Sequence, residues 1–173
     1  IPKIKCCGKP FMSQGMTEKA ISNANYNVEQ LYTCVDNDIE ILGLEPSCTF
    51  TLKEDYPDLL PHNPKAKAIS KKIIQSEDLI HQCVSKLSNE DFTPPGNIFY
   101  QNHCHQKSFV GSAINKLRDI PKCQPVEVGN GCCGMAGSFG FEKEHYDISM
   151  KIGQLNLFEQ LSSLSSQDQI IAS

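Results

Sequence analysis

Apolar residues recur at three- and four-residue steps in two long stretches, the pattern of helices with one buried face. The stretches 17–35 and 65–87 therefore predict helices, the second with lysines on its outer face. Shorter helices are predicted over residues 52–60, 108–118 and 142–161. Proline and glycine at 61, 64 and 94–96 mark breaks between them.

Short runs of apolar residues between these helices predict strands over 1–5, 39–44, 97–101, 125–128 and 169–171. Strands that alternate with helices along a chain are typical of an α/β fold. In such a fold a mostly parallel sheet is flanked by helices. We therefore expect an α/β fold of this kind.

The alternation contains a repeat, in which a strand leads through a cysteine pair and a glycine-rich turn to a helix and a second strand. It is found over residues 4–44 and again over 126–171. We expect one domain, 1–173, built from about one and a half pseudo-repeats. The first partial repeat covers about 1–60, a connecting helix about 65–88 and the second repeat about 97–173.

The cysteine pairs carry the chemistry of this repeat. Cys6-Cys7 is followed by Gly8, and Cys132-Cys133 by Gly134. Glycine permits a tight turn and a close approach of the backbone, and two thiolates on one turn can hold a compact inorganic centre. Iron–sulfur clusters are bound by cysteine thiolates in this way. The alternative is that these cysteines are buried thiols that pack like small apolar residues.

Position along the predicted strands sorts the cysteines into two groups. Cys104, Cys132 and Cys133 all follow strands, at the carboxyl edge where open α/β sheets bind ligands, and we expect their sulfurs to converge. By the same logic the second group consists of Cys6, Cys7 and Cys48. The remaining cysteines are assigned to the apolar core (Cys34 and Cys83) and to a connecting loop (Cys123).

Histidines beside Cys104 leave two interpretations open. His103 and His105 either hydrogen-bond to backbone and water or act on a metal or redox centre. A closed zinc site of three cysteines and His105 is an alternative to a cluster, although the chain has no C-x-x-C pair. Gly129, Gly131 and Gly134 also fit a dinucleotide fingerprint, but no acidic residue ends a second strand at the required distance.

Composition restricts the class of protein. The 173 residues include 16 Lys+Arg and 20 Asp+Glu, a net charge of −4, which argues against a nucleic-acid partner. No apolar run is long enough for an integral membrane segment. Nine cysteines, an odd number in a chain of this size, favour reduced thiols and a cytoplasmic protein over a disulfide scaffold.

Three segments resemble the cysteine-rich CCG domain. They are residues 45–48 (EPSC), 103–107 (HCHQK) and 132–137 (CCGMAG), and the most specific stretch is 131–153. That domain occurs in a subunit of heterodisulfide reductase and in the iron–sulfur subunit of glycolate oxidase. The match is best to the C-terminal part of fused enzymes with an FAD-linked oxidase domain, described as glycolate or D-lactate dehydrogenases.

The resemblance implies an iron–sulfur electron-transfer module of a flavin-dependent 2-hydroxyacid dehydrogenase, an oxidoreductase component. A partner FAD-linked oxidase domain or subunit would hold the flavin, and a quinone or electron carrier would receive the electrons. Without that domain we expect the chain alone to be inactive. Peripheral association with the inner membrane is left open.

The resemblance also assigns residues. The cluster ligands would be Cys104, Cys132 and Cys133 in one repeat and Cys6, Cys7 and Cys48 in the other. Gly131, Gly134 and Gly137 would direct backbone N–H groups at cluster sulfurs, and His103, His105 and Lys107 would offset negative charge. Glu45 stands where the family has a further cysteine. The alternatives are a cluster-based disulfide reductase and a zinc-stabilised, non-catalytic interaction domain.

Overall fold

The chain forms two compact units, Ile1–Leu79 (unit 1) and Ile80–Ser173 (unit 2). The structure, a computed structural model, describes residues 2–84, 86, 97–107, 113–129 and 131–172. The division falls within helix α6 (Ser76–Val84). Each unit holds one Cys-Cys-Gly segment, so each can be described on its own.

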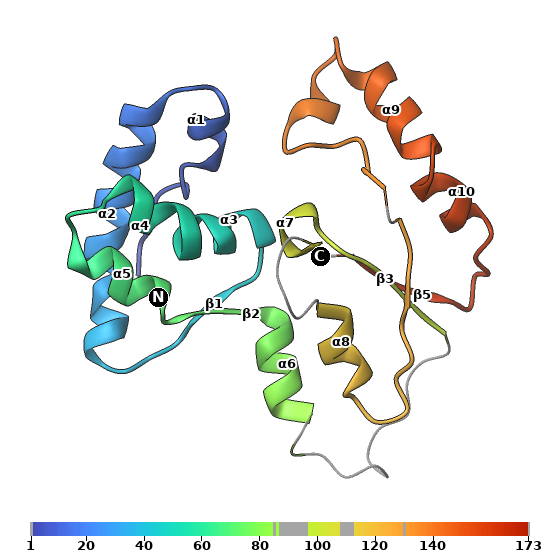
Figure 1. Cartoon of the computed structure of the whole chain (residues 1–173), viewed down its shortest axis with the longest axis horizontal. Helices are drawn as coiled ribbons and strands as arrows, with labels where there is room; N and C mark the ends of the chain where they lie inside the picture. Colours follow the sequence, from blue (N-terminus) through green and yellow to red (C-terminus); the bar gives the residue numbers. More distant parts are fainter. Residues whose placement is uncertain (1, 85, 87–96, 108–112, 130, 173) are drawn as a thin grey trace. The chain divides into compact units, whose positions relative to one another are not determined.

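Unit 1 packs helices against a two-stranded parallel sheet. Its elements before α6 are α1 (Lys9–Ser13), α2 (Thr17–Asp36), β1 (Ile41–Gly43), α3 (Pro46–Phe50), the π-helix η1 (Thr51–Asp55), α4 (Tyr56–Leu59), α5 (Pro64–Ser70) and β2 (Ile73–Gln75). β1 pairs with β2 in parallel, and α2 lies along α4 and α5 (Figure 1). Val28, Tyr56 and Ile69 are completely buried in its core, each contributing roughly 1.5–3 kcal/mol of apolar burial.

Side chains that accept hydrogen bonds from free backbone N–H groups fix where two helices of unit 1 begin. The Glu45 carboxylate accepts from the N–H groups of Ser47 (3.1 Å) and Cys48 (2.6 Å) at the start of α3. Asn63 Oδ1 accepts from the Lys65 N–H (3.0 Å) at the start of α5. Proline follows each capping residue, where a helix needs no N–H donor.

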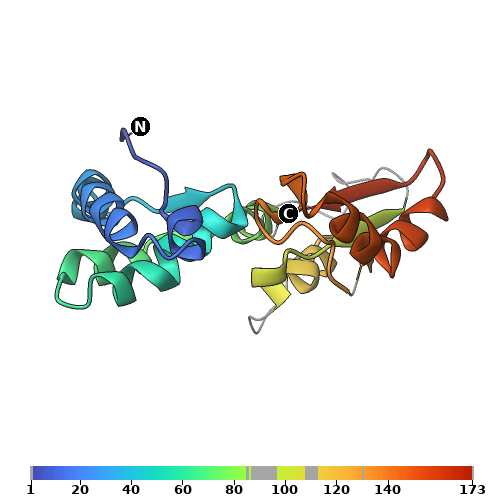
Figure 2. The same ribbon diagram turned by 90° about the horizontal axis from the view of Figure 1, so that it is seen from above.

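Unit 2 is built on a three-stranded parallel sheet of order β4-β3-β5. Its described elements after α6 are β3 (Ile98–Gln101), α7 (Cys104–Lys107), α8 (Ala113–Arg118), β4 (Val126–Glu127), the 3₁₀ turn η2 (Phe139–Phe141), α9 (Tyr146–Gln154), α10 (Leu157–Ser162) and β5 (Gln169–Ala172). β3 and β5 run side by side (Figure 2). Tyr100 and Cys123 lie in its buried core, and Cys123 stands in the loop between α8 and β4, as expected. Cys83, which was assigned to the core, is exposed instead because it lies on an outward side of α6.

The expected α/β fold with parallel sheets and flanking helices is confirmed. The single helix expected over 65–87 is wrong. That stretch contains α5, β2 and α6, because Ile73 and Ile74 pair with Ile41 and Leu42 of β1. β-Branched residues suit a strand, and this pairing outweighs the helical spacing of Ile69 and Ile73.

Other elements differ from their predicted ranges. The helix expected over 142–161 is divided into α9 and α10, because Asn156 leaves the helical conformation with φ −152°. The helix expected over 52–60 begins earlier, at Pro46, where Glu45 caps it. Residues 2–5 form no strand, and residues 108–112 of the helix expected over 108–118 lie outside the described part.

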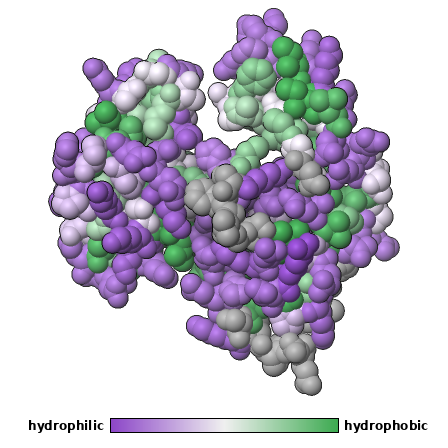
Figure 3. Space-filling view, in the orientation of Figure 1, coloured by the Kyte–Doolittle hydropathy of each residue, from purple (hydrophilic) through white to green (hydrophobic). Residues whose placement is uncertain are grey.

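Apolar side chains reach the surface of unit 2 around α9. Phe141, Tyr146, Ile148 and Leu155 are all exposed, Phe141 to 83%. Figure 3 shows hydrophobic surface over α9 and α10. Among the described helices, none is both long and apolar enough to cross a bilayer.

Candidate functional site

Both Cys-Cys-Gly segments end in the same backbone turn. Gly8 has φ +101° and Gly134 has φ +91°, a conformation that side chains strongly disfavour. In unit 1 the turn leads directly into α1, and in unit 2 into a series of turns before η2. Each cysteine pair is therefore followed immediately by a glycine whose backbone has the left-handed conformation.

Each glycine also lies against the long helix that follows it. A Cβ atom on Gly8 would be 3.4 Å from Cα and Cβ of Ala20 in α2, which is ordinary contact. A Cβ atom on Gly134 would be 2.2 Å from the backbone oxygen of Ser149 in α9, which is impossible without movement. The turn in unit 2 is therefore packed more tightly than its counterpart.

A buried asparagine holds the cysteine pair of unit 1. Asn27 of α2 is 1% exposed, and its Oδ1 accepts from the Lys5 N–H at 2.7 Å. Its Nδ2 donates to the carbonyl oxygens of Lys5 (3.2 Å) and Cys6 (3.4 Å). Asn23, one turn earlier, also donates to the Cys6 carbonyl, at 3.1 Å. These bonds fix the segment that carries Cys6 and Cys7.

An equivalent asparagine occupies the same place in unit 2. Residues 20–43 align with 149–172 without insertion or deletion, which pairs Asn27 with Asn156 and β1 with the end of β5. Asn156 Oδ1 accepts from the Gly131 N–H at 3.4 Å. Gly131 precedes its cysteine pair as Lys5 does in unit 1. The pseudo-repeat therefore includes the hydrogen bond that positions each cysteine pair.

Cys48 lies beside Cys7, although 40 residues separate them in the chain. Cys7 is 6% exposed and Cys48 is half-buried, at the first turn of α3. Burial, the neighbouring Cys7 thiol and the Glu45 carboxylate all raise the pKa of Cys48. A 170 Å³ cavity lined by Glu45 and Cys48 opens at the end of β1.

The phenol of Tyr56 belongs to the same part of unit 1 as the Cys6, Cys7 and Cys48 thiols. It is completely buried, and Asn27 Nδ2 donates to its Oη at 2.8 Å. Burial raises the pKa of Tyr56 to about 12, the Asn27 hydrogen bond acts against this, and Cys7, Cys6 and Cys48 add to it. The phenol is therefore neutral near pH 7 and close enough to the cysteines to respond to their charge.

In unit 2, Cys104 and the cysteine pair follow neighbouring parallel strands. Cys104 begins α7 after β3, and Cys132 follows β4, so both come after carboxyl ends on the same edge of the sheet. Lys107 of α7 donates to the carbonyl oxygens of Gly129 (2.8 Å) and Gly131 (3.4 Å), joining α7 to the turn. The Gly134 N–H donates to Cys132 Sγ at 3.4 Å. Convergence of the three sulfurs stays a prediction.

Polar residues hold the segment around Cys104. Gln106 Oε1, which is buried, accepts from the His103 N–H (3.1 Å) and the Tyr100 hydroxyl (3.3 Å). His103 Nδ1 accepts from the His105 N–H at 3.3 Å, and the two rings are tilted with centroids 5.3 Å apart. The His103 ring therefore bonds to backbone through this atom, as one of the two sequence interpretations expected.

Among the residues that the structure describes, no three His, Cys, Asp or Glu side chains can hold one metal ion between them. Cluster thiolates bind different irons and stand farther apart than ligands of a single ion. Gly137, with φ +70°, has open space around its Cα.

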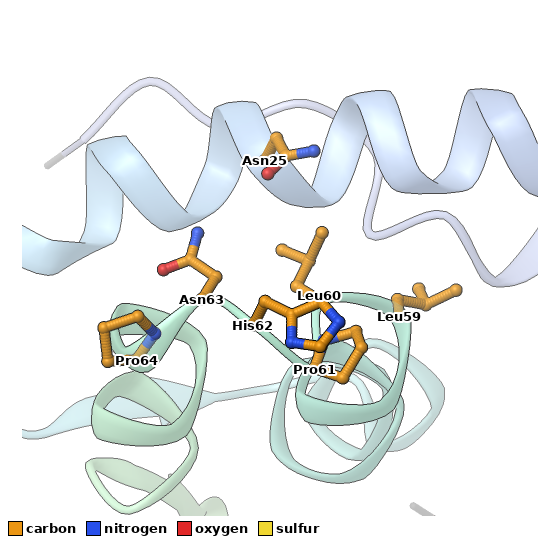
Figure 4. A pocket seen from close by; sticks show the side chains of 7 residues that line it. All are labelled: Asn25, Leu59, Leu60, Pro61, His62, Asn63 and Pro64. Atoms are coloured by element: carbon orange, nitrogen blue, oxygen red, sulfur yellow. The ribbon is translucent and has the colours of Figure 1, made fainter.

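One pocket in unit 1 is separate from this chemistry. It has a volume of 470 Å³ and lies between α2 and the α4–α5 turn, where Asn25 faces Leu60 and Asn63 (Figure 4). None of the nine cysteines, all of which the structure describes, lines it. The cavity beside Cys48 is smaller, and Cys48 is the one proposed ligand that lines it.

Four residues at the sites were not identified from the sequence: Asn27, Tyr56, Asn156 and Gln160. Gln160 Oε1 accepts from the Gly129 N–H at 3.0 Å. Aligning the two helical segments without gaps would have revealed the Asn27–Asn156 pair. Nothing in the sequence singles out Tyr56, because its role follows from where α4 places it.

The family comparison matches both units. The family model for the cysteine-rich CCG domain matches residues 2–53 and 98–172, which together are most of the chain and include both cysteine pairs. No solved structure matches significantly.

Several curated proteins are similar to this chain. One subunit of the anaerobic glycerol-3-phosphate dehydrogenase of Escherichia coli K12 is 31% identical over 93% of this chain and 41% of its own length. D-2-hydroxyglutarate dehydrogenase of Pseudomonas putida is 25% identical over 84% of this chain and 14% of its own. An uncharacterized iron–sulfur protein of Methanococcus maripaludis is 27% identical over 89% of this chain and 29% of its own length. The chain spans less than half the length of each.

Proposed function

The chain belongs to the cysteine-rich CCG domain family, and on that premise we propose that it is the iron–sulfur electron-transfer module of a flavin-dependent dehydrogenase. The observation that carries this proposal is the pair of cysteine-glycine turns, each joined to an asparagine further along the chain, Asn27 within α2 and Asn156 between α9 and α10. Relatives named as dehydrogenases and as an iron–sulfur protein support it.

Six cysteines would hold the inorganic centres. Cys6, Cys7 and Cys48 would serve in unit 1, and Cys104, Cys132 and Cys133 in unit 2. The residues fit such a group, because Cys7 and Cys48 present two neighbouring thiols in a partly buried place without forming a disulfide. A cysteine-bound iron–sulfur cluster takes up and releases single electrons.

The protein's own groups would hold and tune these centres. The Gly134 N–H already points at Cys132 Sγ, and a hydrogen bond to a ligand sulfur stabilises added negative charge. Lys107 places a positive charge at the same turn. Asn27 and Asn156 keep each cysteine pair from moving when charge is gained or lost.

The electrons would come from a partner flavoprotein domain or subunit that oxidises a small hydroxy compound. Glycolate and D-lactate follow from the sequence resemblance, while the names of the relatives add glycerol 3-phosphate and D-2-hydroxyglutarate. The acceptor would be a quinone or an electron carrier. We place the module in the cytoplasm, where it would associate with the inner membrane only through such partners.

Anaerobic reconstitution with iron and sulfide tests this proposal, in the 173-residue chain and in a form extended at both ends. We expect stoichiometric iron and acid-labile sulfide with broad visible absorbance in the extended form. Cys48→Ser and Cys132→Ser should each lower the iron content, whereas the control Cys83→Ser should not. Stoichiometric zinc without iron would contradict the proposal and favour an interaction domain.

A further inference from the structure

Tyr56 carries a hydroxyl proton with no acceptor in the part of the chain that the structure describes. Asn27 Oδ1 accepts from the Lys5 N–H, which fixes the amide so that its Nδ2 faces the phenol. Tyr56 Oη is therefore the acceptor in its 2.8 Å bond with Asn27. A buried O–H that donates to nothing is unfavourable, so its proton calls for a partner close by.

The π-helix η1 places this phenol on the side of Cys48. Residues 46–59 are helical without interruption, and the Tyr56 N–H bonds to the Thr51 carbonyl, five residues back. Positions eight residues apart on an α-helix differ by about 80°, whereas positions seven apart differ by about 20°. Because the π turn adds one residue, Tyr56 stands relative to Cys48 almost as a seventh residue would.

The reach of the side chain completes the placement. Side chains on a helix lean towards its N-terminus, so the Tyr56 ring extends back towards α3 and Cys48. On the opposite side Asn27 joins the phenol to the backbone of Cys6. The helix thus directs the hydroxyl towards Cys48, and Asn27 links it to the segment that carries Cys6 and Cys7.

We propose that, once a cluster is bound by Cys6, Cys7 and Cys48, the Tyr56 hydroxyl donates a hydrogen bond to a sulfur of that cluster and raises its reduction potential. This inference rests on the proposed function. The donor stabilises the extra negative charge of the reduced cluster, as backbone N–H donors to cluster sulfurs do. Tyr56 is a positioning and tuning residue, and it supplies no electron of its own.

Tyr56→Phe in the extended, reconstituted protein is the test. We expect unchanged iron content and a roughly tenfold weaker preference for the reduced state, about 59 mV for a one-electron couple. A deuterium-sensitive shift of the iron–sulfur vibrations should be present in the parent protein and smaller in the variant. Tyr32→Phe is the matched control, since Tyr32 packs on the same core with its ring beneath Lys65.

A second substitution keeps the test valid if Tyr56→Phe fails to fold. Replacing Tyr56 with 3-fluorotyrosine retains the shape and makes the phenol a stronger donor, so the potential should rise. Equal potentials in all variants, with iron bound, would overturn the role of Tyr56 and leave the proposed function intact. A parent protein that binds no iron would overturn both.

Discussion

In unit 1 the cysteine pair is held by an asparagine that is almost completely buried, whereas its counterpart in unit 2 is half-buried and makes one long bond to the turn. Packing at the glycine is tighter in unit 2. A Cβ atom on Gly134 would collide with the backbone oxygen of Ser149, whereas a Cβ atom on Gly8 would be at an ordinary contact distance from Ala20. Two copies of one motif are therefore stabilised by different contacts, hydrogen bonds in unit 1 and close packing in unit 2.

The two helices that follow the turns also differ on their outer faces. Lys19 and Tyr26 of α2 correspond to Ile148 and Leu155 around α9. Ile148 is 51% and Leu155 is 79% exposed. The positions that face the cysteine turn keep the same kind of residue, Ala20 and Ser149 being both small. The repeat is thus retained where it holds the turn and has diverged at the surface.

The largest difference between the units should come from glycine. Gly134→Ala combines backbone strain with a clash against the Ser149 oxygen, for which we expect a loss of about 4 kcal/mol in unfolding free energy. Gly8→Ala meets strain alone and should cost about 2 kcal/mol. Urea unfolding measures both. Equal losses would show that packing at the two turns is the same.

The asparagines should show the reverse order. Asn27→Ala leaves the Lys5 N–H and the Tyr56 hydroxyl without their partner, so we expect a loss of about 3 kcal/mol. Asn156→Ala removes one long bond to the turn and should cost about 1 kcal/mol. Hydrogen exchange at the Lys5 and Gly131 amides locates each effect. If either variant showed faster exchange at both amides, the two turns would not be stabilised independently of each other, contrary to this expectation.

A smaller effect is expected from the lysine at the turn of unit 2. Lys107→Met removes the contacts to the Gly129 and Gly131 carbonyls, so local opening should expose Cys132 and Cys133 more often. We expect their alkylation to become several-fold faster, as measured by mass spectrometry. Lys9→Met is the control, because Lys9 pairs with Asp55 and not with its cysteine turn. Unchanged alkylation would show that Lys107 does not hold the turn.

The smallest effect concerns Glu45, which has no described counterpart in unit 2. Burial raises the pKa of this carboxyl, but hydrogen bonds from Cys48 and Ser47 outweigh it and leave the pKa below its ordinary 4.5. Its stabilisation is therefore complete above about pH 4.5 and is lost as the pH falls through the folded value.

Glu45→Gln should accordingly cost under about 1 kcal/mol near pH 7, since the carboxylate is exposed to solvent. Thermal unfolding of the parent chain and the variant at pH 7 and pH 3 measures it. The two proteins should differ less at the lower pH. A difference that grows on acidification would contradict this account of the cap.

Local patterns along the chain were enough to predict the α/β class, which the structure confirms, whereas the pseudo-repeat and the two groups of cysteine ligands stay predictions. Helical spacing identified α2, and the cysteine-glycine turns were found because only a few residue types permit left-handed backbone. These features depend on local chemistry, which a sequence shows directly. The membership in the CCG family agrees with them.

Elements that depend on distant partners could not be predicted from local patterns. Ile73 and Ile74 became a strand because β1 offers them a parallel neighbour, and no local pattern contains that information. In the same way Tyr56 meets Asn27 only after α4 packs on α2. Hydrogen bonds and packing between residues far apart in the chain set both outcomes, so periodicity could not predict them.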